Sequence, residues 1–115
     1  MIDFACRTLS LDDLIKCAFA LTRTELTIFK YLVRHPGTPL TTDEIASALG
    51  VDVSTVQRAV KKLHDRKVLE KQQRNLGSGG YVFVYVCAEK QRIKAIIEDN
   101  LRRFSKKVDQ ALEEW

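Results

Sequence analysis

The chain has 115 residues, of which 45% are hydrophobic and 30% are charged, and its formal net charge is +4. This length suits one compact domain with one hydrophobic core, and a second full domain does not fit. The longest apolar runs, residues 17–21 and 81–88, are far shorter than the ~20 residues that cross a bilayer, and no basic-then-apolar leader begins the sequence. We therefore expect a cytoplasmic protein without a membrane partner.

Two helices are predicted in the first third of the chain. From Ser10, an N-cap residue, early acidic residues and apolar residues at helical spacing predict the first helix. Thr22 and Glu25 form a capping-box pattern before a second, strongly apolar helix, which ends at residues 35–37, the sequence His-Pro-Gly. This second helix is expected to be central to the core.

Two further helices follow, joined by a short turn. Thr41 and Glu44 repeat the capping-box pattern before a helix of barely two turns, which ends at Gly50 because glycine adopts a left-handed backbone easily. Asp52 is predicted to cap a fourth helix that extends to about Arg66. This fourth helix is amphipathic. Its polar, basic stripe is opposite a core-facing side formed by Val56, Ala59, Val60 and Leu63.

A β-hairpin is predicted after the fourth helix. Residues 68–74 and 81–87 are two extended runs, and the connection between them, Asn-Leu-Gly-Ser-Gly-Gly, has the glycines of a flexible turn. In the second run aromatic residues alternate with valines, so both faces are apolar. Both faces of that strand are therefore expected to be at least partly buried.

One long helix is predicted at the end of the chain. Residues 88–115 contain no proline or glycine, and apolar residues recur there at spacings of three and four. A helix of about 27 residues spans ~40 Å and would overhang so small a body. We therefore expect a homodimer interface formed by Ile97, Leu101, Phe104, Val108 and Trp115. The alternative is that this seam packs back on the first helix, at Leu11, Leu14 and Phe19.

Basic charge is concentrated in the fourth helix and the hairpin. Residues 53–75 carry seven basic and two acidic side chains, a net charge of +5, so the rest of the chain is net −1. Such a concentration is typical of a polyanion-binding face. A short capped helix, a glycine-containing turn and a longer basic helix form a helix-turn-helix, whose second helix enters the major groove of DNA.

The pattern also predicts which side chains contact DNA. The first turns of a recognition helix lie near base edges, and these turns carry Ser54, Thr55, Gln57 and Arg58. Phosphate contacts are expected further along the same helix, from Lys61 and Lys62. The glycine-rich hairpin tip lets backbone and polar side chains approach a phosphate or the minor groove, with Lys71, Arg74 and Asn75 beside it.

A family resemblance supports this interpretation. Residues 40–46, LTTDEIA, and residues 49–58, LGVDVSTVQR, resemble the winged helix-turn-helix of MarR-like and TrmB-like regulators, with a match over about residues 22–87. The resemblance implies a homodimer on a pseudo-palindromic operator and a wing at residues 71–78, which adds Ser78 to the contacts. The wing lacks the Asp-x-Arg pattern usual in MarR-type proteins, and the chain looks more like the short, single-domain archaeal-type regulators. The effector is left open.

Further chemistry is not indicated. Cys6, Cys17 and Cys87 form an odd count without paired spacing, so reduced thiols are expected. Cys17 and Cys87 are each expected to be a small buried hydrophobe. With His35 these thiols have no metal-ligand spacing, and no nucleophile or metalloprotease motif occurs. We therefore expect no catalytic residue, no metal and no cofactor.

Together these patterns predict a mostly α-helical α+β protein. A winged helix-turn-helix domain is expected over residues 1–87, with the helix-turn-helix at about 41–66 and the wing at about 68–87. A dimerisation helix is expected over residues 88–115. The predicted function is a homodimeric regulator of transcription that binds specific double-stranded DNA. Two alternatives stay open, a protein-interaction module of the transcription machinery and a thiol-responsive regulator that uses Cys6 and Cys17.

Overall fold

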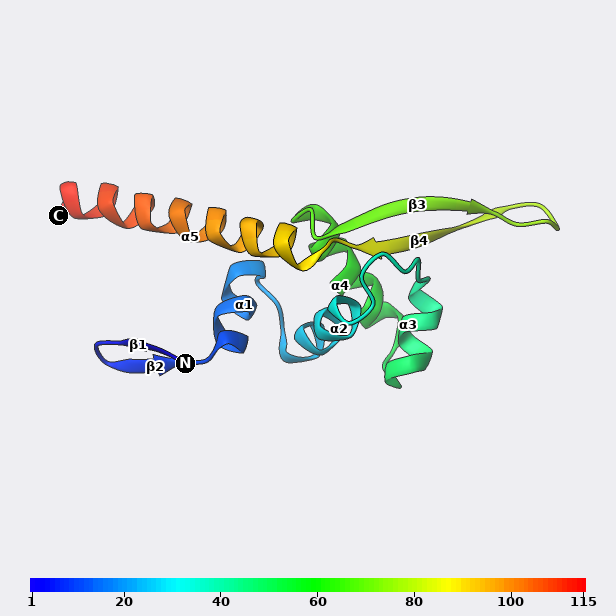
Figure 1. Cartoon of the computed structure of the whole chain (residues 1–115), viewed down its shortest axis with the longest axis horizontal. Coiled ribbons are helices and arrows are strands. Elements are labelled where there is room, and N and C mark those ends of the chain that lie inside the picture. The colour runs from blue at the N-terminus through cyan, green and yellow to red at the C-terminus, as the bar shows by residue number, and fades with distance from the viewer.

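Five helices and two antiparallel β-hairpins make up the computed structural model, which describes residues 1–115 (Figure 1). In chain order the elements are β1 (Ile2–Phe4), β2 (Arg7–Leu9), α1 (Leu11–Phe19), α2 (Arg23–Val33), α3 (Thr42–Leu49), α4 (Val53–Asp65), β3 (Leu69–Asn75), β4 (Tyr81–Cys87) and α5 (Lys90–Glu113). The predicted α+β, mostly helical fold with a hairpin wing and a long last helix is confirmed.

The helices begin where their capping residues require. Ser10, Thr22 and Thr41 each accept a hydrogen bond from the backbone N–H three residues on. The acidic side chain there accepts a second hydrogen bond, from the backbone N–H of the capping residue. Asp52 does occupy the N-cap position of α4, but the prediction that its side chain caps the helix is wrong. Its carboxylate accepts a hydrogen bond from the Ser54 hydroxyl instead.

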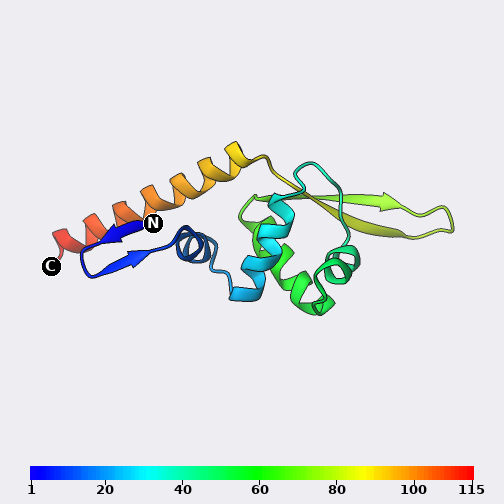
Figure 2. The same cartoon turned by 60° about the horizontal axis from the view of Figure 1, so that its bottom comes forward.

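The hydrophobic core lies where α2, α3 and α4 meet the base of the β3–β4 hairpin (Figure 2). The predicted inner side of α4 is confirmed, since Val56, Ala59, Val60 and Leu63 are at most 1% exposed. Each large apolar side chain buried in this way stabilises the fold by about 1.5–3 kcal/mol relative to an exposed one. This packing fixes which side of α4 faces outward.

The wing is the β3–β4 hairpin, whose register pairs Leu69 with Cys87 at its base and Asn75 with Tyr81 near its tip. A single extra bridge joins Leu40 to Tyr85, through backbone hydrogen bonds of 3.0 and 2.8 Å. The expected burial of both β4 faces holds near the base but is wrong for Tyr81, which is 55% exposed, and for Phe83, 39% exposed. The reason is that the hairpin projects well beyond the helical body (Figure 1).

The last helix, α5, extends from the body in the direction opposite to the wing, so the molecule measures 61 × 25 × 24 Å (Figure 1). Ile93 is its only buried residue, and Ile96 and Ile97 pack partly against the core. The amide of Asn100 donates a 3.2 Å hydrogen bond to the carbonyl of Ala18 at the end of α1. Beyond Asn100 every residue of α5 is exposed.

The N-terminal hairpin β1–β2 was not predicted from the sequence. Its strands are three residues long, and the turn between them, Ala5-Cys6, has no glycine, asparagine or proline to signal it. The hairpin lies at the same end of the molecule as the C-terminal half of α5 (Figures 1 and 2). Ile2 and Phe4 are exposed there, with Phe4 at 72%.

The three thiols occupy different surroundings. Cys87 is buried as expected, and burial raises its pKa to about 11. The expected burial of Cys17 is wrong, because this residue lies in a hollow of about 600 Å³ between α1 and α5 and is exposed. Cys6 is exposed in the N-terminal hairpin turn. None of the five helices has the apolar stretch that a membrane span requires.

We expect a thiol reagent such as Ellman's reagent to modify Cys6 and Cys17 rapidly in the folded monomer at pH 8 and to leave Cys87 unmodified until unfolding. The thiolate is the reacting species, and burial disfavours it at Cys87. A Cys87→Ala variant is the control and should keep the full rapid phase. Three equally rapid thiols in the native protein would contradict the burial of Cys87.

Candidate nucleic-acid interface

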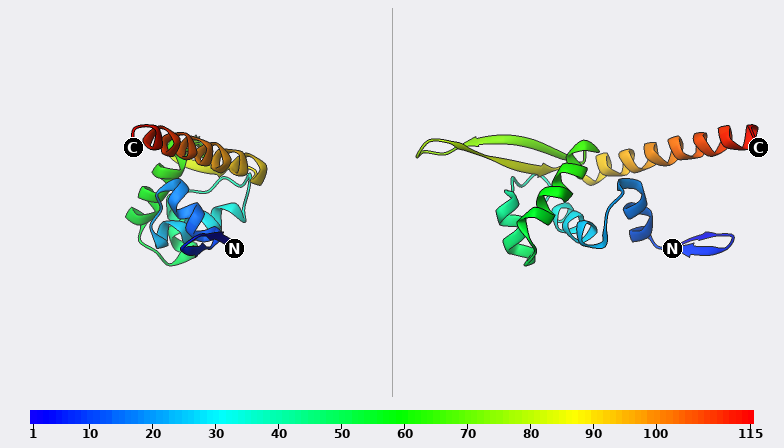
Figure 3. Two further views of the ribbon diagram at one scale, coloured as in Figure 1. Left: turned by 90° about the vertical axis from the view of Figure 1, so that its left-hand side faces the viewer. Right: turned by 180° about the vertical axis from the view of Figure 1, so that it is seen from behind.

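Six side chains of α4 are exposed. We call four of them, Ser54, Gln57, Arg58 and Lys61, the outer stripe, and the other two, His64 and Asp65, lie in the last turn of the helix. The core-facing side of the same helix is fully buried, so the stripe cannot turn inward. Seen from behind, α4 lies in front of α2, and no other element covers it (Figure 3, right). The stripe contains no acidic residue.

Local hydrogen bonds orient part of this stripe. The guanidinium of Arg58 donates to the Thr55 hydroxyl at 3.3 Å, and Thr55 itself is half-buried. The Ser54 hydroxyl donates to Asp52. Thr55 and Ser54 are therefore engaged with neighbours on their own helix, whereas the side chains of Gln57 and Lys61 make no hydrogen bond to the protein and project from the stripe.

Lys62 differs from its neighbour Lys61. Its ammonium group donates to the Glu25 carboxylate at 2.7 Å and to the backbone carbonyl of Ala20 at 3.0 Å. Lys62, predicted to contact phosphate, therefore forms an ion pair that joins α4 to the start of α2. Glu25 is the only buried charged residue of the chain, and Lys62 neutralises it.

Glu25 also serves its own helix, since Oε1 accepts a 2.9 Å hydrogen bond from the Thr22 backbone N–H. Burial alone raises the pKa of the Glu25 carboxyl, because the charged form loses solvation. The hydrogen bonds from Lys62 and from the Thr22 backbone outweigh that effect and lower the pKa below its ordinary value. The carboxylate therefore stays ionised and holds Lys62 in place at neutral pH.

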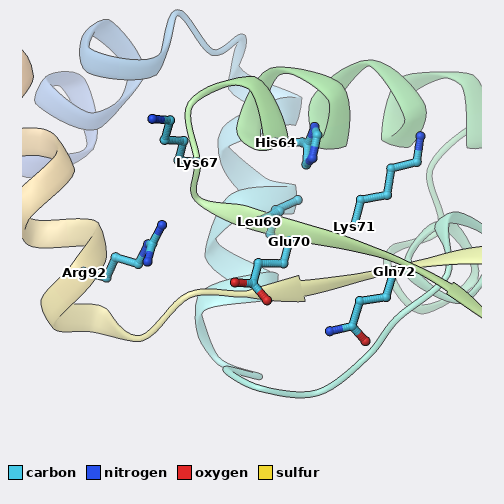
Figure 4. A pocket seen from close by; sticks show the side chains of 7 residues that line it. All are labelled: His64, Lys67, Leu69, Glu70, Lys71, Gln72 and Arg92. Atoms are coloured by element: carbon cyan, nitrogen blue, oxygen red, sulfur yellow. The ribbon is translucent and has the colours of Figure 1, made fainter.

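A groove of about 350 Å³ separates the end of α4 from the first half of β3 (Figure 4). Figure 4 shows Lys71 directed to the side of β3 on which α4 lies, and Glu70 and Gln72 directed to the other side. The groove is mainly basic, because its lining residues are His64, Lys67, Leu69, Glu70, Lys71, Gln72 and Arg92. The α4-facing side of the wing therefore continues the basic surface of α4.

The outer half of the wing carries the remaining predicted contact residues. Arg74, Asn75 and Ser78 are all exposed there. The side-chain oxygen of Asn75 accepts a 3.2 Å hydrogen bond from Gln73, which leaves the Asn75 amide nitrogen free to donate. Gly79 and Gly80 have φ of 95° and 80°, a backbone conformation that favours glycine and closes the turn. Residues 71–88 contain two basic and no acidic side chains.

The predicted interface residues of α5 form a second exposed surface. Leu101 is 40% exposed, Phe104 67% and Val108 41%, while Trp115 is almost fully exposed just beyond the helix. Only Ile97 of the predicted seam is half-buried, against the body. Leu101 and Phe104 also line the hollow that α5 forms with α1, together with Leu14 and Ala18. The alternative prediction, that the whole seam packs back on α1, therefore holds only for the first turns of the seam.

A capped helix, a left-handed Gly50, an outward amphipathic helix and a projecting hairpin define a winged-helix protein. A model of the MarR family matches residues 21–76. A protein from Methanosarcina mazei Go1, described as a possible transcriptional regulator, is 42% identical and has a TM-score of 0.90, over 100% of this chain and 96% of that one. The chain is a MarR-like winged-helix protein.

Two more distant relatives also match this chain. An uncharacterized protein of Methanocaldococcus jannaschii is 28% identical over 109 residues, which are 95% of this chain and 81% of that protein. A MarR protein from Peptoclostridium difficile is 20% identical, covers 90% of this chain and 74% of that one, and has a TM-score of 0.54. The likeness to the second of these shows the fold alone.

Proposed function

We propose that this protein is a homodimeric regulator of transcription that binds specific double-stranded DNA, with α4 in the major groove and the wing on the adjoining backbone and minor groove. The observation that carries this proposal is the outer stripe of α4, which holds Arg58 and Lys61 and lies exposed beside the basic α4-facing side of the wing. An α-helix fits the major groove, and a basic face neutralises phosphate charge. The match of residues 21–76 to a model of the MarR family supports the proposal.

The outer stripe divides into two kinds of contact. Gln57 and Arg58 have the two-pronged amide and guanidinium groups that pair with adenine and guanine edges. Lys61 is a point charge suited to phosphate, as are Lys71 and Arg74 on the wing. Ser54, Thr55, Asn75 and Ser78 complete the proposed contact surface. We leave Lys62 out of this surface, because its ammonium group is bound to Glu25 and Ala20. Its proposed role is to position α4 against α2.

The dimer is proposed to form through the exposed apolar residues of α5 and of the N-terminal hairpin, which lies at the same end of the molecule. Exposed apolar residues along this end include Phe4, Leu101, Phe104, Val108, Leu112 and Trp115. A monomer rarely leaves so continuous an apolar surface in water. The 24 residues of α5 span about 36 Å, which is comparable to the ~34 Å between half-sites one DNA turn apart. A second copy bound across this surface would give the dimer two α4 helices, one for each half-site of the DNA.

The test is a binding selection on genomic fragments, followed by titration of the selected site and of random DNA over a range of salt concentrations. We expect Arg58→Ala to lower affinity for the selected site by about 5- to 100-fold with little change on random DNA, since a base contact carries specificity. Lys61→Ala should weaken both DNAs alike and reduce the salt slope by about 0.9, the value of one phosphate contact.

Arg102→Ala on α5 is the matched control for both variants, since Arg102 is exposed away from α4 and the wing. It should leave both affinities unchanged. A wild-type protein that binds no site more tightly than random DNA would overturn the proposal. Stable capture of a heteromeric protein partner without DNA protection would favour a protein-interaction module instead.

A further inference from the structure

Two aromatic rings lie exposed on the part of the wing that projects from the body. Tyr81 and Phe83 are 55% and 39% exposed, and their ring centroids lie 5.3 Å apart in an edge-on arrangement. The ammonium of Lys71 lies 4.1 Å from the centre of the Phe83 ring. A cation over a ring face is held there by the ring's electrostatic field. The lysine and the two rings therefore form one continuous surface.

The strand register shows which side of the wing this surface occupies. Gln73 pairs with Phe83 and Asn75 with Tyr81, and paired residues of an antiparallel sheet direct their side chains to the same face. Lys71 belongs to that face by alternation, and it is directed to the side of β3 on which α4 lies (Figure 4). We call the residues Lys71, Gln73, Phe83 and Tyr81 the aromatic wing face. It is on the same side of the wing as α4.

The core does not account for these rings. All of β3 beyond Leu69 is exposed, and this half of the hairpin extends past every helix (Figures 1 and 2). The contact between the Tyr81 and Phe83 rings, two residues apart on β4, would stabilise the hairpin, but an aromatic pair contributes only about 0.5–1.5 kcal/mol. The charge beside the rings points to a polyanion, because the Lys71 ammonium lies over Phe83 and residues 71–88 hold no acidic residue.

We infer that the aromatic wing face packs against the deoxyribose wall of the minor groove, with the Lys71 ammonium held beside a phosphate. The inference rests on the proposed DNA-binding function and adds the chemistry by which the wing binds. Tyr81 and Phe83 bury apolar sugar surface, and proteins that enter the minor groove commonly use such apolar contacts. Gln73 and Asn75 supply amides on the same face. The wing thus holds DNA by apolar contact, and its sequence lacks the charged Asp-x-Arg pattern that is usual in MarR-type proteins.

A test separates apolar from ionic binding. The double variant Tyr81→Thr and Phe83→Thr keeps β-forming residues in β4 while it removes both rings. We expect its affinity to fall about 5- to 50-fold on selected and random DNA alike with an unchanged salt slope, because no phosphate contact is lost. Lys71→Ala should instead reduce the slope by about 0.9. The conservative pair Tyr81→Phe and Phe83→Tyr should retain wild-type affinity.

A second readout does not depend on lost affinity. In a Trp115→Phe background, Tyr81→Trp places the only tryptophan of the chain on the aromatic wing face. Its emission should be quenched or shifted when DNA binds, whereas Tyr31→Trp in the same background, on α2, should show no change. An unchanged emission at position 81, or unchanged affinity of the threonine variant, would overturn the inference while the wild-type protein still binds DNA.

The remaining outcomes are also decisive. If the wild-type protein binds no DNA, the proposed function fails, and the inference fails with it. If the threonine variant changes the sedimentation behaviour of the protein while DNA affinity stays the same, the aromatic wing face contacts a second copy, and the inference is wrong.

Discussion

Replacing Leu101 and Phe104 together with serine is expected to convert the protein from a dimer to a monomer and to reduce operator affinity by at least about 100-fold. Two linked reading sites bind with an avidity about 10²–10⁴ above that of one, and a monomer loses this gain. Both side chains are exposed on α5, so their replacement removes no core contact of the α2–α4 body. Sedimentation measures the dimer, and titration of the selected DNA site measures the affinity.

The matched control lies on the same turns of α5. Arg102 and Lys106 are exposed neighbours of Leu101 and Phe104, and Arg102→Ser with Lys106→Ser should leave both the dimer and the affinity unchanged. Random DNA provides a second comparison, since weak non-specific binding needs only one reading site of the protein. A serine variant that stays dimeric, or a wild-type protein that sediments as a monomer at micromolar concentration, would contradict the proposed interface.

Lys62→Met should lower the free energy of unfolding by about 1–3 kcal/mol, because it leaves the buried Glu25 carboxylate without its charged donor. The lower part of this range applies, since the Lys62 side chain is 41% exposed and water screens the pair. Urea unfolding measures the change. Lys61→Met, one residue away in the outer stripe, is the matched control and should not change the stability.

The pair can be isolated with a double variant. Glu25→Gln with Lys62→Met should be more stable than Lys62→Met alone, because the unpaired buried charge is gone. Equal stabilities of these two variants would show that the ion pair contributes nothing. The DNA-binding salt slope of Lys62→Met should equal that of the wild type, and a slope lowered by about 0.9 would return Lys62 to the phosphate contacts.

The same carboxylate gives stability a pH dependence. The pKa of Glu25 is lowered in the folded protein from its ordinary value of 4.5, so folding is favoured wherever the group is ionised. This contribution is complete above about pH 4.5 and is lost as the pH falls through the lowered pKa of the folded state. The pKa of Asp13 is lowered in the same direction by its hydrogen bonds with Ser10. Glu25→Gln should flatten the acid limb of the stability profile.

Local patterns in the sequence predicted most of the fold. The pairs Thr22 with Glu25 and Thr41 with Glu44 mark helix starts because both partners lie within one turn, so neighbours alone determine the geometry. The buried side of α4 and the pairing of β3 with β4 likewise follow from short-range periodicity. For the same reason the outer stripe could be identified before the structure was known.

Long-range contacts and exposure could not be predicted in this way. Lys62 and Glu25 are 37 residues apart, and no local pattern distinguishes Lys62 from Lys61. Cys17 lies in an apolar run, and only the divergence of α5 from α1 leaves it exposed. The alternation in β4 indicated two apolar faces, but how far the hairpin projects depends on the size of the helical body. The length of β4, seven residues, was the one signal in the sequence for the exposure of Tyr81.

The C-terminal turn of α1 receives a side chain from each of two other helices. Asn100 of α5 donates to the Ala18 carbonyl, and Lys62 of α4 donates to the Ala20 carbonyl. Carbonyls at a helix end lack partners within the helix, so these two acceptors are available to link neighbours. The turn therefore links the orientation of α5 to that of α4. In a dimer formed through α5, the angle of α5 would determine the distance between the two α4 helices. Half-site spacing in the operator would then be encoded as much by Asn100 and Lys62 as by any residue that contacts DNA.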